Sequence, residues 1–238
     1  MNDIRLEISG LSAGYNGVAV VRDLSLSVEG GEVVVLLGPN GAGKTTTLLT
    51  VSGLLPAIAG EINVLGQSVS HRSAHKIARS GLSHVPEDRS LFFQLTVAEN
   101  LRLGARGKPD AHRAFEYFPA LEPLMDRRAG LLSGGEQQML SMARALTVPP
   151  KLLIVDELSL GLAPIIVERL LPVLRDVADK TGAGVLFVEQ HVDLALAIAD
   201  RAYVMSHGDL VLTNDARHLR ENRSLLEASY VGVAGEGS

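Results

Sequence analysis

One short segment constrains the fold more than any other. Gly38 to Thr45 reads Gly-Pro-Asn-Gly-Ala-Gly-Lys-Thr and matches the phosphate-loop pattern G-x-x-x-x-G-K-[ST] at every fixed position. Residues 33–37 before it are valine and leucine and predict a buried strand, while residues 45–52 after it predict a helix. Backbone N–H groups of such a turn, together with the helix dipole, favour phosphate. The segment therefore predicts a nucleoside triphosphate site, with an ordinary glycine-rich turn as the alternative.

Length and composition describe an ordinary globular chain. Its 238 residues are 46% hydrophobic and 21% charged, and they suit one large domain or two small ones. A net charge of −5 offers no basic footprint for nucleic acid, and the absence of cysteine excludes disulfides and thiolate metal sites. No apolar stretch approaches the roughly 18 residues that a membrane-spanning helix needs. Any role at a membrane is therefore expected to depend on a partner chain.

Strand and helix signals predict three regions that differ in secondary structure. Alternating apolar residues at 24–28 and a strand signal at 61–65 predict an antiparallel β region near the N-terminus. Residues 84–145 are mostly helical in pattern, with a loop and helix cap expected at 106–110. Beyond them, strand and helix signals alternate, which favours a mostly parallel sheet. The later signals are strands at 151–155, 184–188, 202–205 and 210–213, and helices at 165–178 and 192–199.

The predicted fold class is therefore α/β. We expect a P-loop NTPase core with a mostly parallel sheet, an antiparallel β flank at the N-terminus and an inserted helical subdomain. The expected layout is a single domain over residues 1–238, in which a helical subdomain at 84–146 interrupts a core formed by 1–83 and 147–238.

Two adjacent carboxylates follow the predicted strand at 151–155. The sequence Leu152-Leu153-Ile154-Val155-Asp156-Glu157 places Asp156 at the strand end, where its carboxylate can hold Mg²⁺ beside the phosphate loop. Glu157 points to the other side of the strand and can polarise an attacking water. Many buried strands end in acidic residues, so the pair alone does not indicate a metal site. It indicates one here because a phosphate loop precedes it in the chain.

A second glycine-rich segment precedes a helical run. Leu132-Ser133-Gly134-Gly135-Glu136-Gln137-Gln138 contains a capping box, with Ser133 as N-cap and Glu136 three residues on. The capping box does not explain two glycines in the first turn, where each costs about 1 kcal/mol relative to alanine. Bare glycines at a helix N-terminus let a phosphate approach the backbone closely.

With these three elements in this order, the chain resembles the ATP-binding subunits of ABC transporters over essentially its whole length. The resemblance implies a RecA-like core, bound ATP and Mg²⁺, and active sites formed only in a head-to-tail dimer. It implies that Tyr15 stacks on adenine, that Glu157, His191 and Lys44 are catalytic, and that Thr45, Asp156 and Glu87 form the metal site. The implied phosphate loop is Gly38, Pro39, Asn40, Gly41, Ala42, Gly43, Lys44, Thr45 and Thr46, and the signature that contacts the opposite subunit's ATP is Ser133, Gly134, Gly135, Glu136 and Gln137.

Departures from the general pattern indicate a subgroup. Glu87 stands where most relatives have glutamine, and Ser159-Leu160-Gly161-Leu162-Ala163-Pro164 follows the acidic pair. Both features resemble the ATPases of branched-chain amino acid importers. Urea or amide importers, and paired ATPases for other hydrophobic or aromatic solutes, are close competitors. Leu158 fits neither group, because proline is expected there.

The resemblance implies an ATP-driven import motor at the cytoplasmic face of the inner membrane, held there peripherally. The implied partners are transmembrane permease subunits, a second ATPase subunit in a homo- or heterodimer, and indirectly a solute-binding protein; nucleic acid is not expected. Two alternatives remain: a soluble ABC-type ATPase outside transport, and a nucleotide-dependent module that binds ATP without appreciable hydrolysis.

Overall fold

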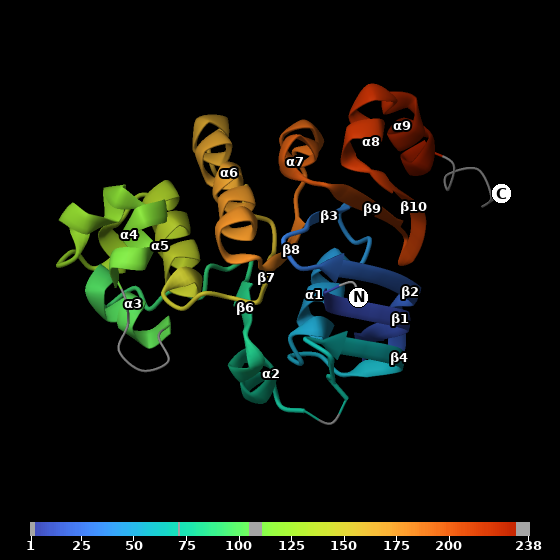
Figure 1. Ribbon diagram of the computed structural model, residues 1–238, viewed down its shortest axis with the longest axis horizontal. Helices are drawn as coiled ribbons and strands as arrows, with labels where there is room; N and C mark the ends of the chain where they lie inside the picture. The colour runs from blue at the N-terminus through green and yellow to red at the C-terminus, as the bar shows by residue number, and fades with distance from the viewer. Residues whose placement is uncertain (1–2, 71, 105–110, 232–238) are drawn as a thin grey trace.

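Two β-sheets organise the chain, and helices cover the parallel one (Figure 1). The computed structural model describes residues 3–70, 72–104 and 111–231. The predicted loop at 106–110 therefore lies outside the described residues.

The N-terminal sheet is antiparallel, as predicted. Its strand order is β2-β1-β4-β5, and every neighbouring pair in it is antiparallel. Apolar and polar residues alternate along β1 and β2, because one face of each strand packs into the core and the other meets solvent. Its strands are β1 (Ile4–Tyr15), β2 (Val18–Glu29), β4 (Ala57–Val64) and β5 (Gln67–Ser68).

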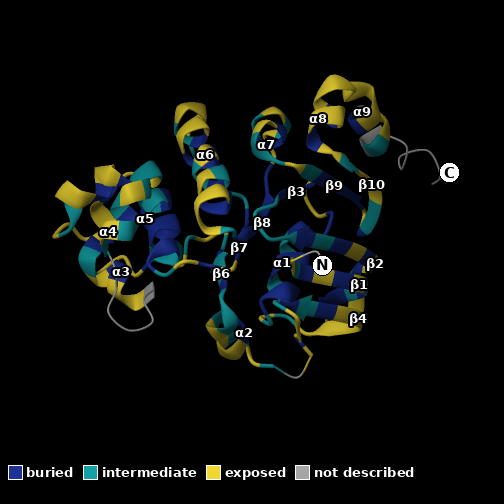
Figure 2. Ribbon diagram, viewed as in Figure 1, coloured by how far each residue is buried: buried dark blue, intermediate teal, exposed yellow. Residues whose placement is uncertain are grey.

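The second sheet holds the phosphate loop. Its order is β10-β9-β3-β8-β7-β6, parallel from β9 to β6, with β10 antiparallel at one edge. The central strands β3, β7 and β8 are buried along their whole length, which accounts for their unbroken apolar sequences (Figure 2). Its strands are β3 (Val33–Leu37), β6 (Leu82–Val85), β7 (Leu152–Val155), β8 (Gly184–Val188), β9 (Arg201–Ser206) and β10 (Asp209–Asp215).

Helices divide between the sheet and a separate lobe. The lobe of α3, α4 and α5 stands at one end of the molecule in Figure 1, beside α6. The helices are α1 (Lys44–Val51), α2 (Ala74–Ser80), α3 (Val97–Gly104), α4 (Ala111–Tyr117), α5 (Gly134–Leu146), α6 (Pro164–Thr181), α7 (Val192–Ile198), α8 (Ala216–Glu221) and α9 (Arg223–Val231). Two short 3-10 helices, Pro119–Leu124 and Ala129–Leu131, lie within the lobe segment.

Two apolar cores hold these layers together. One joins the parallel sheet to α6, α7 and the helical lobe, and includes Phe187 and Leu140. The other lies between the two sheets, where Leu48 and Val51 of α1 pack against side chains of both. Because α1 begins at the phosphate loop and is held between the sheets, the position of the loop is fixed by the centre of the fold.

The predicted α/β class, with its parallel sheet and antiparallel N-terminal sheet, is confirmed. The expected start of the helical segment at residue 84 is wrong in detail. His84 and Val85 belong to β6 and pair with Ile154 and Val155 of β7. The division into a core and a helical subdomain at 84–146 stays a prediction.

Candidate nucleotide-binding and hydrolysis site

The phosphate loop connects β3 to α1 at the carboxyl edge of the parallel sheet. Two of its glycines are sterically required. A Cβ on Gly38, whose φ is 150°, would lie 2.3 Å from the carbonyl oxygen of Met205. A Cβ on Gly43, whose φ is 101°, would lie 2.7 Å from a methyl of Val21. The loop backbone is therefore pressed against the sheets, leaving its other side for phosphate.

Lys44 is buried, with 4% of its surface exposed, and its ammonium is held by the loop itself. Nζ donates hydrogen bonds to the carbonyl oxygens of Gly38 and Pro39, each at 2.9 Å. It also lies 4.0 Å from Oε1 of Glu157. Burial lowers the pKa of Lys44, and the nearby carboxylates of Glu157 and Asp156 act in the opposite direction. The motif predicts that the Lys44 ammonium contacts the β- and γ-phosphates.

Thr45 and Asp156 meet across the loop and the end of β7. The Thr45 hydroxyl donates to Oδ1 of Asp156 at 3.2 Å. The pKa of Asp156 is raised to about 6, mainly by burial; the carboxylates of Glu157 and Glu87 also raise it, while the Thr45 hydrogen bond and the Lys44 charge lower it. Hydroxyl and carboxylate oxygens are the ligands that Mg²⁺ prefers, and an aspartate destabilised by burial gains from a bound cation. The donor set therefore fits the predicted metal.

A cavity of about 320 Å³ brings several of the predicted residues together, although Asp156 does not line it. It is lined by Lys44, Thr45 and Thr46 from the start of α1, by Glu87 from the segment after β6, and by Glu157. Residues separated by more than a hundred positions thus face one space, because the parallel strands β3 and β7 end at the same edge of the sheet.

Glu157 leaves β7 with an unusual backbone. Its φ is +39°, a left-handed conformation that costs free energy for a residue with a side chain. Leu158, which follows it in place of the expected proline, is fully buried in the core. Ser159 then donates a hydrogen bond to the buried carboxylate of Glu189. Core packing and this hydrogen bond hold the turn.

Several predicted residues lie outside this cavity. Tyr15 ends β1 with 49% of its surface exposed, and His191 is the N-cap residue of α7. In the described part of the chain, the cavity lining includes neither of them, nor any signature residue from Ser133 to Gln137. Their predicted contacts with ATP therefore stay predictions.

The signature residues begin α5 on the helical lobe. The capping box is present: Ser133 N donates to Oε2 of Glu136 at 2.7 Å, and Glu136 N donates to the Ser133 hydroxyl at 3.3 Å. These bonds lower the pKa of Glu136. A Cβ on Gly134 would meet the Leu162 side chain at 3.7 Å, an ordinary contact. Packing within this chain thus does not require glycine at Gly134.

Four contacts near the site involve residues that the sequence patterns did not single out. Gln190 donates to Glu157, and Glu189 accepts from Ser159. Arg89 donates to Oε1 of Gln138 at 2.9 Å and to Oε1 of Gln137 at 3.0 Å, joining the Glu87 segment to the signature helix. Only Arg89 gave any signal, since it stands two residues after Glu87. Gln190 and Glu189 belong to no local pattern, because their contacts span thirty or more residues.

Comparison with known proteins agrees with this geometry. A family profile described as ABC transporter matches residues 21–159, more than half of the chain. The chain belongs to the ABC transporter family. It is an ATP-binding subunit of that family, whose members hydrolyse ATP, as the phosphate loop and acidic pair predicted.

Three relatives place this ABC subunit more closely. It is 40% identical to the high-affinity branched-chain amino acid transport ATP-binding protein BraG of Pseudomonas aeruginosa, over 95% of this chain and 99% of that protein. It is 39% identical to the lipopolysaccharide export system ATP-binding protein LptB of Escherichia coli K12, over 87% of this chain and 88% of that protein. Among solved structures, an ATP-binding subunit of an ABC transporter superposes with a TM-score of 0.83 at 29% identity, covering 96% of this chain and 99% of that one.

Proposed function

We propose that this ABC subunit is the ATP-hydrolysing motor of an importer for branched-chain or other hydrophobic amino acids. The observation that carries the proposal is the similarity to BraG, which extends over nearly the whole of both chains. Glu87 and the segment from Ser159 to Pro164 support it, since both resemble the importer subgroup.

Lipopolysaccharide export is the second candidate. LptB is almost as similar in identity, although the match covers a smaller share of both chains. Urea or amide import remains a third candidate from the sequence pattern. The motor subunit carries no solute pocket of its own in this proposal, so the choice among solutes belongs to an uptake experiment.

In the proposed mechanism, Lys44 and the loop N–H groups bind the β- and γ-phosphates. Mg²⁺ would be held by Thr45 and Asp156, with Glu87 nearby, and would supply positive charge at the phosphate oxygens. Glu157 orients the attacking water, and His191 contacts the γ-phosphate. The signature residues Ser133 to Gln137 of a second ATPase subunit close over the nucleotide, so ATP binding closes a dimer and hydrolysis opens it.

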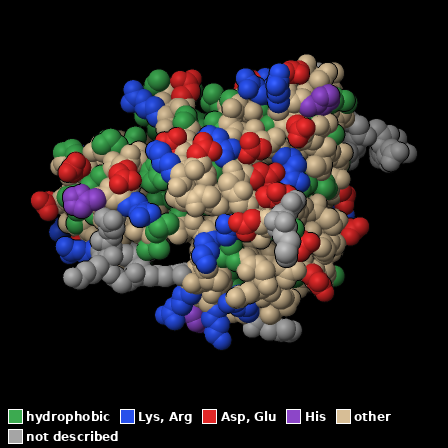
Figure 3. Space-filling view, in the orientation of Figure 1, with side chains coloured by type: hydrophobic (Ala, Val, Ile, Leu, Met, Phe, Trp, Pro, Cys, Tyr) green, Lys and Arg blue, Asp and Glu red, His purple; other side chains and the backbone are tan. Residues whose placement is uncertain are grey.

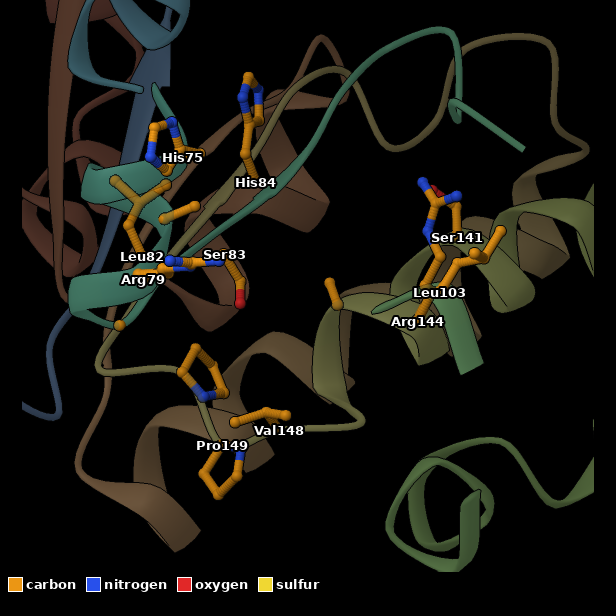
Figure 4. Close-up of a pocket in the computed structure, with 14 residues that line it drawn as sticks. His75, Arg79, Leu82, Ser83, His84, Leu103, Ser141, Arg144, Val148 and Pro149 are labelled. Atoms are coloured by element: carbon orange, nitrogen blue, oxygen red, sulfur yellow. The ribbon is translucent and has the colours of Figure 1, made fainter. Parts of the chain in front are cut away.

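A groove beside the helical lobe supports docking of permease subunits. Its volume is about 370 Å³, and it separates α2 and β6 from α5. Figure 4 shows Arg144, Ser141 and Leu103 on one side, and Arg79 and His84 on the other. Positively charged side chains gather over α2 in Figure 3. The groove lies next to the segment after β6, so a permease loop seated there would sense the nucleotide through Glu87.

This motor would sit at the cytoplasmic face of the inner membrane, bound to its permeases. In the portions of the chain that the structure describes, no helix has the length and apolar character needed to cross a bilayer. Attachment through the groove is the proposed means of association.

Solute uptake tests the proposal. In cells that encode the chain, deletion of its gene should abolish high-affinity uptake of labelled leucine, isoleucine and valine. The parent gene and Glu168→Gln, a charge-matched change on the exposed face of α6, should restore uptake, and Glu157→Gln should not. Unchanged uptake together with lipopolysaccharide retained in the inner membrane would support the LptB-like role. Loss of labelled urea uptake alone would support the third candidate.

A further inference from the structure

One side of helix α2 is formed by basic side chains. His75, Lys76 and Arg79 are all exposed, and their positions lie within about 100° of one another around the helix axis. Ile77, on the opposite side of the helix, is fully buried in the core. Figure 3 shows Lys and Arg side chains gathered over this helix. The helix therefore has an apolar side that anchors it and a cationic side that meets solvent.

The positive charge extends beyond the helix at both ends. Arg72 comes just before α2 in the chain, and Lys151 is an exposed residue just before β7. Lys151 lies beside the end of α2, because a Cβ on Gly81 would come within 3.0 Å of its Cγ. We refer to four residues as the basic face: Arg72, Lys76, Arg79 and Lys151.

Carboxylates are scarce around the basic face. Residues 62–86 contain no Asp or Glu, although the whole chain has 27 of them and a net charge of −5. In the part of the chain that the structure describes, no ion pair involves Arg72, Lys76 or Lys151. By contrast, an exposed cation on α6 and another on α8 each pair with a carboxylate one helical turn away. The charge of the basic face is therefore available to an anion from outside the chain.

The composition of this region favours lipid headgroups over nucleic acid as that anion. Residues 62–86 contain no Phe, Tyr or Trp on which bases could stack, and domains that bind nucleic acid are usually basic as a whole. An anionic leaflet, in contrast, attracts a local basic segment of a protein that is acidic elsewhere. This selectivity arises because the attraction extends only over a Debye length of about 8 Å.

The position of α2 also favours a lipid surface. His75 and Arg79 line the groove that we propose as the permease docking site, whereas Lys76 does not. A permease seated in the groove would therefore hold α2 close to the membrane in which that permease lies.

We propose that the basic face binds the headgroups of anionic phospholipids at the membrane surface. It gives the motor a contact with the bilayer that is separate from its contact with the permeases. This inference rests on the proposed function only in placing the chain at a membrane.

Vesicle sedimentation tests the inference on the full chain without permeases. Vesicles of phosphatidylglycerol and phosphatidylcholine in equal parts should bind the parent, vesicles of phosphatidylcholine alone should not, and added salt should weaken binding. Lys76→Gln together with Arg79→Gln should weaken binding on the order of 10- to 30-fold, since each cation near an anionic leaflet strengthens it about fivefold. The control is Arg217→Gln with Arg220→Gln, an equal change at the same spacing on exposed positions of α8, far from α2 in Figure 1. This control should bind as the parent does.

A single variant separates lipid binding from the groove. Lys76→Gln leaves the groove lining intact, so it should weaken vesicle binding about fivefold and keep parent-like recovery of permeases from detergent extracts.

Several results would overturn the inference. They are parent-like vesicle binding by the α2 pair, equal losses in the α2 and α8 pairs, and equal binding to vesicles with and without phosphatidylglycerol. Binding of labelled duplex DNA that the α2 pair loses would assign the basic face to nucleic acid instead. Failure of the parent to recover permeases would refute the proposed importer role and leave the vesicle result unaffected.

Discussion

At the scale of single residues, Asp156 combines a buried carboxyl with a proposed role as a ligand of Mg²⁺. Its carboxyl is 2% exposed at the end of β7, and burial raises its pKa to about 6. In an unfolded chain the same group titrates near 3.9. The folded chain therefore binds the proton more tightly, and the ionised form costs it stability. This cost is absent well below pH 4, grows between about pH 4 and 6, and is complete above that range.

Asp156→Asn should remove this pH-dependent cost. Without Mg²⁺, the free energy of unfolding of the variant relative to the parent should rise on the order of 2 kcal/mol between pH 4 and pH 7.5. Denaturant unfolding at several pH values measures this difference. Addition of Mg²⁺ and ATP should raise the free energy of unfolding of the parent more than that of the variant, because the cation would bind the ionised carboxylate. A difference that does not vary with pH would contradict the assigned burial cost.

Leu158 provides a second residue-scale prediction. Leu158→Pro restores the residue expected in the family, but it removes a fully buried side chain from the core. We expect an ATPase kcat that is neutral or modestly raised, with a loss of about 2 kcal/mol in stability. Leu158→Ala is the control, since it opens a similar cavity without constraining the backbone. A large loss of kcat in folded Leu158→Pro would show that leucine itself is needed at this turn.

At the scale of elements, the start of α5 has an observed capping role and a proposed role in binding ATP, and the two can be tested separately. The capping box of Ser133 and Glu136 satisfies the first N–H groups of the helix. Gly134 contributes nothing to that cap, and a Cβ there would make only an ordinary contact with Leu162. The proposed approach of a phosphate from outside the chain would account for glycine at this position.

Gly134→Ala should consequently separate stability from activity. Alanine favours helix, so the free energy of unfolding should stay unchanged or rise by up to about 1 kcal/mol. ATPase activity should fall more than tenfold, since in the proposed dimer the new methyl group would face the nucleotide of the opposite subunit. Thermal unfolding and steady-state turnover, compared side by side, measure the two effects. An active variant would remove the reason for assigning this helix end to ATP.

Local patterns predicted the elements better than the contacts between them. The strand at 33–37 and the helix at 165–178 carry their own periodicity, so both were predicted within a few residues. β6 was missed because Leu-Ser-His-Val is a strand only by pairing with β7. Gln190 and Glu189 were missed for the same reason. Their roles arise from hydrogen bonds to residues about thirty positions away, which no local pattern encodes.

At the scale of the whole molecule, the groove between α2 and α5 is the proposed docking site for the permease subunits. Leu103 lines it with 56% of its surface exposed, so little folding energy depends on this side chain. Leu103→Asp should reduce recovery of permease subunits about tenfold, because a carboxylate replaces an apolar contact. Its stability should change by no more than about 0.5 kcal/mol.

The control for the groove is an equal change elsewhere. Leu225 of α9 is 39% exposed and lies away from the groove, so Leu225→Asp should recover the permeases as the parent does. Equal losses from both variants would show that added charge, not the groove, disrupts the assembly.

Co-purification tests the account most directly. A tagged Glu157→Gln chain, extracted from native membranes with ATP and Mg²⁺, should be held in its ATP-bound state together with its partners. We expect recovery of two multi-spanning permeases and a second ATPase subunit, identified by mass spectrometry. Recovery of the chain alone, or with nucleic acid, would contradict the transport motor while leaving the nucleotide site in place.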